Sequence, residues 1–181
     1  QEQYISKILF NTRRLSHLAG NILLLSKIEH QSIQTRQNWY RLDEQIRQSI
    51  VMMEPKWSEK EIEFDVDMMD VEYLGNENLI CHVWDNLLSN AIKFSPCGGT
   101  IYIRMMPEGE KIRFSIENEA PQISEYSMKH IFDKFYQGDS SHKQEGNGLG
   151  LALVKQILNL CKGTVSLENI PGSGCRFTVI L

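Results

Sequence analysis

A ladder of four polar side chains runs through an otherwise apolar segment, residues 82–96, and consists of His82, Asn86, Asn90 and Lys93. In a helix these four positions fall within an arc of about 80°. Asn has poor helix propensity, so two Asn residues four apart among Leu and Ile favour a use beyond solvation. An amide oxygen suits a hard cation such as Mg²⁺, and a Lys ammonium suits a phosphate. A solvated helix surface is the alternative that this pattern alone leaves open.

A glycine run lies further along the chain, at residues 146–153, with the sequence GNGLGLAL. Gly146, Gly148 and Gly150 allow close approach of a ligand to the backbone, and free amides at the start of a helix favour anions. Leu149 and Leu151 would anchor the run. The pattern lacks the Gly-Lys-Ser/Thr ending of a P-loop, and no buried parallel strand precedes it as in a Rossmann fold. The sequence therefore predicts a phosphate-facing loop, with a flexible turn as the alternative.

The elements that must position these residues follow from apolar periodicity and from turn residues. The chain of 181 residues is long enough for one domain of about 100–150 residues and an appendage. Residues 4–30 have a heptad-type apolar seam, which predicts a helix that packs on other helices. The spacing further predicts a helix over 42–54 that Pro55 stops, a helix over 76–95 that Asn76 caps and Pro96 ends, and helices over 123–132 and 148–160. It predicts strands over 61–68, 71–74, 100–106, 111–116, 163–168 and 175–181. The expected fold class is α/β, a two-layer sandwich with a mixed, largely antiparallel sheet behind a long N-terminal helix.

Composition excludes some partners and indicates the compartment. The net charge of −4 implies no general attraction to nucleic acid or anionic lipid, and no apolar run is long enough to span a bilayer. We therefore expect no nucleic acid and no membrane contact by these residues. The four cysteines lack zinc or redox spacing and are expected to be buried, reduced thiols in a cytoplasmic protein. Because the chain begins with Gln1 inside an expected helix, we interpret it as a piece of a longer protein. Other parts of that protein can anchor it in a membrane.

Three motifs in order resemble those of sensor histidine kinases of two-component systems, which belong to the GHKL superfamily. Residues 82–96 resemble the N box, residues 131–136 (IFDKFY) the F box and residues 146–153 the G2 box. The resemblance covers residues 40–181 and implies the Bergerat-type sandwich shared with gyrase-like ATPases and Hsp90 chaperones. It divides the chain into a helix of a truncated dimerisation and histidine phosphotransfer domain (1–30), a linker (31–41) and a catalytic ATP-binding domain (42–181).

The same resemblance assigns roles in binding ATP and Mg²⁺. It implies that Asn90 is the main Mg²⁺ ligand, that Asn86 assists at metal or phosphate, and that Lys93 meets phosphate oxygens. Phe132, Phe135 and Tyr136 would seat the lid on the domain. Either Lys134 or Lys143 would give that lid its positive charge, because Gln137 stands where the family often has Arg. The implied ATP-binding residues are Asn86, Asn90, Lys93, Asn118, Ile123, Phe132, Tyr136, Gly146, Gly148, Leu149, Gly150 and Leu151.

The G1 box departs from the family pattern Asp-x-Gly-x-Gly. Asn118 stands at the Asp that accepts a hydrogen bond from the adenine amino group, and Ala120 and Gln122 replace glycines. An amide oxygen accepts the same bond without charge assistance, so we expect adenine binding weaker by about 1 kcal/mol.

The resemblance implies a protein histidine kinase that transfers the γ-phosphoryl of ATP for relay to a response regulator. His17 lacks the acid and the Pro of the family's acceptor motif, so the acceptor helix is expected upstream of Gln1 and the fragment should not phosphorylate itself. Asn86 occupies the place of the Glu that activates water in related ATPases, and Asn cannot take a proton, which favours transfer over hydrolysis. We expect a homodimer of the full-length protein. The alternatives are a degenerate nucleotide- or partner-binding domain without phosphotransfer and an anti-sigma-factor-type serine kinase.

Overall fold

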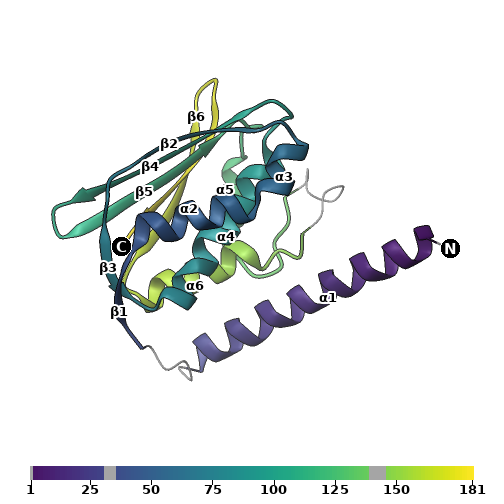
Figure 1. Ribbon diagram of the computed structural model, residues 1–181, viewed down its shortest axis with the longest axis horizontal. Helices are drawn as coiled ribbons and strands as arrows, with labels where there is room; N and C mark the ends of the chain where they lie inside the picture. The colour runs from purple at the N-terminus through teal and green to yellow at the C-terminus, as the bar shows by residue number, and fades with distance from the viewer. Residues whose placement is uncertain (1, 31–35, 139–145) are drawn as a thin grey trace.

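The structure is a computed structural model that describes residues 2–30, 36–138 and 146–181. The helices are α1 (Glu2–Glu29), α2 (Leu42–Met52), α3 (Glu54–Glu59), α4 (Glu77–Phe94), α5 (Glu125–His130) and α6 (Gly150–Leu160). The strands are β1 (Asn38–Arg41), β2 (Glu63–Met68), β3 (Glu72–Gly75), β4 (Thr100–Glu108), β5 (Lys111–Asn118), β6 (Thr164–Ile170) and β7 (Gly174–Ile180). Figure 1 shows α2, α4 and α6 stacked against one face of the larger sheet, which is the two-layer α/β arrangement expected from the sequence.

In the described part of the chain, the larger sheet has the strand order β2-β4-β5-β7-β6. Strand β2 pairs with β4 in parallel, whereas β4, β5, β7 and β6 pair in antiparallel fashion, so the sheet is mixed and largely antiparallel. In this register Asn118, the last residue of β5, lies opposite Cys175 of β7. This pairing places the end of β5 beside the turn that precedes β7.

Helix α4 is the central helix and is strongly two-faced. Asn76 caps its first turn by accepting a hydrogen bond from the Leu79 amide at 3.0 Å, as its sequence position predicted. Trp84 is fully buried; its ring packs on Phe114 of β5 at 4.8 Å between centroids, and its indole N–H donates to Gln45 of α2 at 2.9 Å. Replacing so large a buried ring by alanine costs about 3–5 kcal/mol. The apolar face of α4 therefore fixes the direction in which its polar face points.

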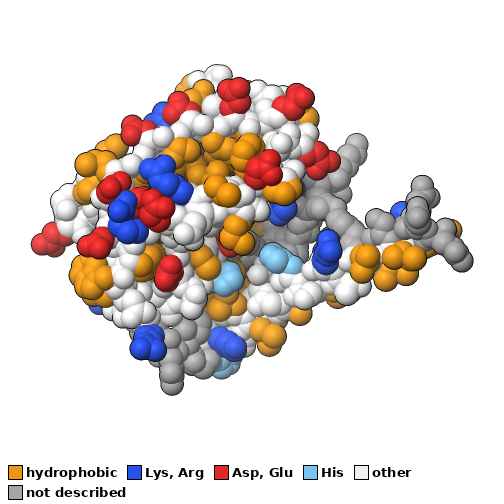
Figure 2. Space-filling model, viewed as in Figure 1, with side chains coloured by type: hydrophobic (Ala, Val, Ile, Leu, Met, Phe, Trp, Pro, Cys, Tyr) orange, Lys and Arg blue, Asp and Glu red, His pale blue; other side chains and the backbone are white. Residues whose placement is uncertain are grey.

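Helix α1 contacts α6 through only part of its length. Leu25 and Ile28, near its C-terminal end, are buried, whereas many apolar side chains further toward the N-terminus are exposed, several of which Figure 2 shows along the helix. Among the α1 side chains that the structure describes, the exposed large apolar ones are Tyr4, Ile5, Ile8, Leu9, Leu15, Ile22 and Leu23. Across the described residues, no helix combines the length and apolar character that crossing a bilayer requires.

The fold differs from the sequence prediction at two places where Pro and tertiary pairing matter. Residues 38–41, expected as linker, form β1, because each of them pairs with a residue of β3. Pro55 was expected to stop a helix, and α2 does end at Met52, but Pro55 then stands in the first turn of α3. A proline is tolerated there because the first amides of a helix have no intrahelical acceptor.

Candidate nucleotide-binding site

The polar face of α4 points toward the start of α6. Asn86, Asn90 and Lys93 are half-buried on this face. The Asn86 amide nitrogen donates to the His82 carbonyl at 2.7 Å, which orients the side-chain oxygen. That oxygen lies so close to Gly150 that a Cβ atom added there would be 2.5 Å from Asn86 Oδ1. A glycine at position 150 is therefore what lets the amide oxygen reach the helix terminus.

The glycine run curves around this terminus. Gly148 has φ +67°, and its carbonyl accepts from the Phe135 amide at 2.8 Å. A Cβ atom at Gly148 would come within 2.6 Å of the Phe135 backbone, so a side chain is excluded by space as well as by backbone angle. Helix α6 then begins at Gly150 with no side-chain hydrogen bond to its first amides. Those amides, at the positive end of an 11-residue helix, suit an anion.

A second contact joins the ladder and the glycine run at Gly146. A Cβ atom there would lie 3.1 Å from Lys93 Nζ, so the ammonium sits beside the first glycine of the run. The structure thus brings together Asn86 with Gly150 and Lys93 with Gly146, residues that are far apart in sequence. We call Asn86, Asn90, Lys93 and residues 146–150 the α4–α6 site.

The end of α4 is held by a residue that the sequence analysis missed. Lys60 Nζ donates to the carbonyls of Ile92, Lys93 and Ser95 at 2.7, 3.0 and 2.6 Å. A cation at a helix C-terminus satisfies carbonyls that have no intrahelical donor. Nothing in the sequence around Lys60 signals this contact, which depends on how the segment after α3 packs on α4.

The expected adenine end of the site lies at the junction of β5 and β7. Asn118 is 3% exposed, and its side-chain oxygen accepts from the Cys175 thiol at 3.6 Å. Burial raises the pKa of Cys175 to about 11, so the thiol stays protonated and can donate near neutral pH. Ile123, the other residue expected here, is fixed through its backbone, which exchanges hydrogen bonds of 2.9 and 2.8 Å with the Asn169 side chain. Cys175 and Asn169 were missed because only the strand register reveals them.

The aromatic residues of the F box contact different parts of the protein. Phe132 packs edge-on against Phe177 of β7 at 6.4 Å, and the Tyr136 hydroxyl donates to Ser127 at 2.9 Å, so both side chains hold to the domain. Phe135 is 64% exposed and, with Leu149, lines a hollow of about 160 Å³ against α1. Phe135 was expected to seat the lid on the domain; it has a positive φ of 63° and borders α1 as well as Leu149.

Of the two lysines expected to give the lid its positive charge, the structure describes only Lys134. Lys134 forms an ion pair with Glu29 of α1, so its charge is already neutralised. Lys143, the other expected source of charge, lies outside the described residues. Leu149, in contrast, is buried as expected, and Leu151 is half-buried in the first turn of α6.

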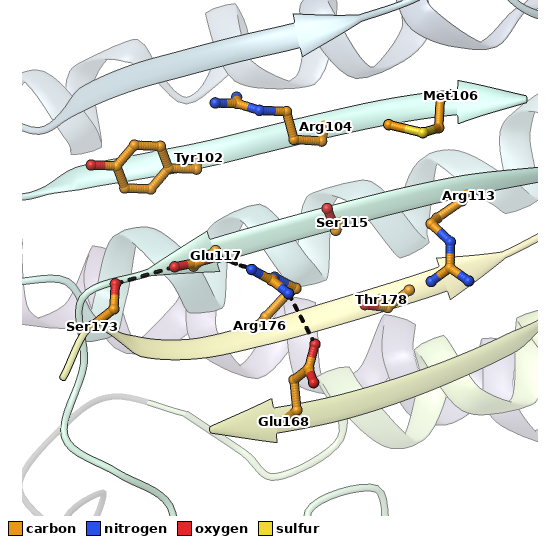
Figure 3. Close-up of a pocket in the computed structure, with 10 residues that line it drawn as sticks. All are labelled: Tyr102, Arg104, Met106, Arg113, Ser115, Glu117, Glu168, Ser173, Arg176 and Thr178. Carbon is orange, nitrogen blue, oxygen red and sulfur yellow. Dashed lines mark hydrogen bonds and ion pairs between the residues drawn. The ribbon is translucent and has the colours of Figure 1, made fainter. Parts of the chain in front are cut away.

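A hollow of about 490 Å³ lies on the opposite, helix-free face of the sheet. Figure 3 shows Arg176 at its centre between Glu117 and Glu168, with ion-pair distances of 2.7 and 3.2 Å. The Glu117 carboxylate holds the pKa of the Arg176 guanidinium above its ordinary value. None of the residues that line this hollow belongs to the polar ladder or to the glycine run. The hollow is therefore separate from the α4–α6 site.

Comparisons with known proteins agree with the motifs. Residues 75–181 match the family described as histidine kinase-, DNA gyrase B- and HSP90-like ATPases, a domain that binds ATP. The chain is 32% identical over 179 residues to the heme sensor protein HssS of Staphylococcus saprophyticus and 32% identical over 181 residues to that of Staphylococcus aureus. These alignments cover 99% and 100% of the chain but only 38% and 39% of the relatives' lengths.

Solved structures show the same fold. The nucleotide-free catalytic domain of histidine kinase ThkA superposes with a TM-score of 0.73 at 28% identity, over 81% of this chain and 97% of that one. The histidine kinase AdeS of Acinetobacter baumannii superposes with a TM-score of 0.86 over 100% of this chain and 84% of that one, and its 24% identity shows the fold alone. The α/β fold class and the family resemblance that the motifs indicated are both confirmed.

Proposed function

The chain belongs to the family of histidine kinase-, DNA gyrase B- and HSP90-like ATPases, and from this premise we propose that it is the ATP-binding catalytic part of a sensor histidine kinase. In this proposal it binds ATP with Mg²⁺ and transfers the γ-phosphoryl group to a histidine on a separate helix. The observation that carries the proposal is the double contact of the α4–α6 site, Asn86 with Gly150 and Lys93 with Gly146. An ammonium and a glycine backbone at a helix start together suit a polyphosphate.

The donor set of α4 fits Mg²⁺. Amide oxygens are hard, neutral ligands, and Mg²⁺ completes its octahedron with waters and substrate phosphates rather than with a full protein cage. The space that a Cβ atom at Gly150 would fill keeps the Asn86 oxygen unobstructed. Asn90 would hold the cation, with Asn86 assisting, and the bound cation would neutralise charge on the phosphates during transfer. The chain's own part is to orient the triphosphate through Lys93, Gly146, Gly148 and Gly150.

Asn118 would recognise the adenine amino group. Its oxygen already accepts one weak bond from the Cys175 thiol, and a carbonyl oxygen has a second lone pair for a ligand. Because the amide is neutral, the bond to adenine lacks charge assistance. Ile123, Phe132, Tyr136 and Leu151 would provide the surrounding contacts.

The residue types favour phosphoryl transfer over hydrolysis. Asn86 stands where a general base for water would be needed; its amide cannot take a proton and donates to the His82 carbonyl. His17, the histidine of α1, contacts Asn21 rather than an acid, at 3.5 Å. We therefore propose that the acceptor histidine lies outside these residues, on a helix that pairs with α1 in a homodimer.

The remaining assignments follow the same proposal. Residues 1–30 would be a helix of the dimerisation and phosphotransfer domain, 31–41 the linker and 42–181 the catalytic domain. The exposed apolar residues of α1 support this division, since such a seam suits helix pairing. A structure of ThkA in complex with the response regulator TrrA, 26% identical with a TM-score of 0.74, supports a response regulator as partner.

A degenerate domain that binds nucleotide without transfer is the second candidate. Asn118, Ala120 and Gln122 favour it, because a buried amide and two bulkier residues replace the acid and glycines expected at the adenine loop.

The test has two steps on the chain of residues 1–181. Binding of labelled ATP is measured with Mg²⁺ and with EDTA, and transfer is then measured to an added phosphotransfer helix pair that carries an acceptor histidine. Mg²⁺-dependent binding followed by acid-labile phosphorylation of the acceptor supports the kinase. Binding without transfer supports the degenerate domain, and no binding at millimolar ATP contradicts both.

A further inference from the structure

The carbonyl of Gly146 accepts hydrogen bonds from two side chains that come from different parts of the fold. Gln137 Nε2 donates to it at 2.9 Å, and Arg14 Nη2 of helix α1 donates to it at 3.4 Å. Lys93 Nζ lies beside the same glycine. The first residue of the glycine run therefore lies close to both a guanidinium of α1 and an ammonium of α4.

The position of Arg14 on α1 is set by helix geometry. Counting along the helix, Arg14, Leu18, Asn21, Leu25 and Ile28 are spaced four, three, four and three residues apart, so they share one face. Asn21, Leu25 and Ile28 are buried and Leu18 is half-buried, so this is the face that α1 turns toward the rest of the protein. Arg14 continues that face one turn further and is directed at the glycine run.

Arg14 also differs from the other arginines that have described partners. Arg41, Arg104, Arg113 and Arg176 each pair with a carboxylate. Among the described residues Arg14 donates instead to a neutral carbonyl, and a guanidinium has five N–H donors. Its positive charge is thus not neutralised by an acid there, and a planar fork of donors suits bidentate contact with a phosphate.

The F box also carries a cation, Lys134, but an acid already neutralises its charge. Lys134 is paired with Glu29, and this pair fixes α1 against the segment that leads to the glycine run. Together with the buried Leu25 and Ile28, it holds α1 at the orientation that brings Arg14 to Gly146.

We propose that Arg14 is a further nucleotide-binding residue, which contacts the terminal phosphate of the bound nucleotide from outside the catalytic domain. The proposal rests on the proposed function, since it needs a triphosphate in the α4–α6 site. It has a regulatory consequence: any movement of α1 that withdraws Arg14 weakens the hold on the γ-phosphate while the adenine and the inner phosphates stay bound.

The experiment compares ATP with ADP on the chain of residues 1–181. The affinities of both nucleotides are measured with Mg²⁺ for the unaltered chain and for Arg14→Ala and Arg14→Gln. Loss of a charge-assisted contact to the γ-phosphate should weaken ATP binding about tenfold in both variants and change ADP binding less than about twofold. Arg13→Ala is the matched control, because Arg13 is also exposed and its side chain points about 100° away. The substitution removes the same charge from the same helix.

Each outcome separates the two proposals. A selective loss for ATP with an unaffected Arg13 control supports the assignment. Equal weakening of ATP and ADP assigns Arg14 to ordering the loop only and overturns it, as do unchanged affinities in both Arg14 variants. If the unaltered chain binds neither nucleotide, the proposed function fails and this inference fails with it. Circular dichroism of each variant establishes that α1 remains helical.

Discussion

Polar side chains gather on both sides of the large sheet, but they are arranged differently on the two sides. On the helix-free face, Arg176 lies between Glu117 and Glu168 (Figure 3). Arg113 pairs with Glu108 across the hairpin. On the helix-covered side, the α4–α6 site presents amide oxygens, a lysine and glycine backbone. The first face satisfies its own charges across neighbouring strands, whereas the second provides groups that suit an added metal ion and anion.

This difference shows why a hollow alone does not identify a binding site. The helix-free hollow is more voluminous than the one between α1 and the F box, yet its guanidinium groups already have carboxylate partners. A ligand there would have to displace these existing ion pairs before its own charges could bind. The proposed nucleotide site is instead marked by a glycine whose missing side chain leaves room for Asn86.

The largest expected effect is on metal-dependent binding. Asn90→Ala should weaken Mg²⁺-dependent ATP binding on the order of 100-fold, since removing even a partner of a metal ligand costs up to that much. The measurement is isothermal titration calorimetry with Mg²⁺ and with EDTA. Asn78→Ala, the same change at an exposed position of α4, is the control. If ATP binding by the Asn90→Ala variant still depends on Mg²⁺, Asn90 does not hold the metal ion. The proposed difference between the two sides of the sheet is then wrong.

A smaller effect is expected from filling the space beside Asn86. Gly150→Ala places a Cβ atom 2.5 Å from Asn86 Oδ1, so the amide must rotate away from its position. Because the displaced group is the end of a side chain, the fold should survive. ATP affinity should fall about tenfold, the loss expected when a metal-binding side chain is misplaced. Gly20→Ala on α1, where a Cβ atom meets nothing within 4 Å, should leave affinity unchanged. Equal affinities of the two variants would contradict the contact.

Asn118 provides a comparable test at the adenine end. Asn118→Ala should weaken ATP binding about fivefold to tenfold, the value of one neutral hydrogen bond of about 1 kcal/mol. Inosine triphosphate lacks the adenine amino group, so its affinity should change little in the same variant. Competition binding of the two nucleotides measures the ratio. A parallel loss for both nucleotides would mean that Asn118 supports the fold rather than reads the base.

The smallest effect is expected on the helix-free face. Arg176→Ala removes ion pairs to Glu117 and Glu168 and should lower the free energy of unfolding by about 1 kcal/mol, or the melting temperature by about 2–4 °C. ATP affinity should not change. Thermal denaturation and titration on the same sample test both statements. A marked loss of ATP affinity would show that the outer face takes part in binding.

The sequence predicted well those features that depend on neighbours along the chain. The Asn76 cap, the Pro96 boundary of α4, the alternation of β4 and β5, and the glycine start of α6 all follow from local geometry. What it missed depends on partners that are distant in sequence. Lys60 reaches the end of α4, Cys175 faces Asn118 only through strand register, and β1 exists because β3 pairs with it.

The orientation of Phe135 shows the same limit at the site itself. Its aromatic type and its place in the F box led us to expect contact with the domain, but they did not indicate that its side chain also borders α1. Only the positive φ of Phe135 and the packing of Ile22 and Leu25 reveal this, and neither can be read from a single sequence.

The three hydrogen bonds from Lys60 affect the entropy cost of binding a ligand beside α4. They restrain the last turn of α4 before anything binds, since its terminal carbonyls are held by a single ammonium. The conformational entropy of that turn is therefore lost when the chain folds rather than when nucleotide arrives. Preorganisation of this kind strengthens binding by lowering the ordering cost at the moment of association.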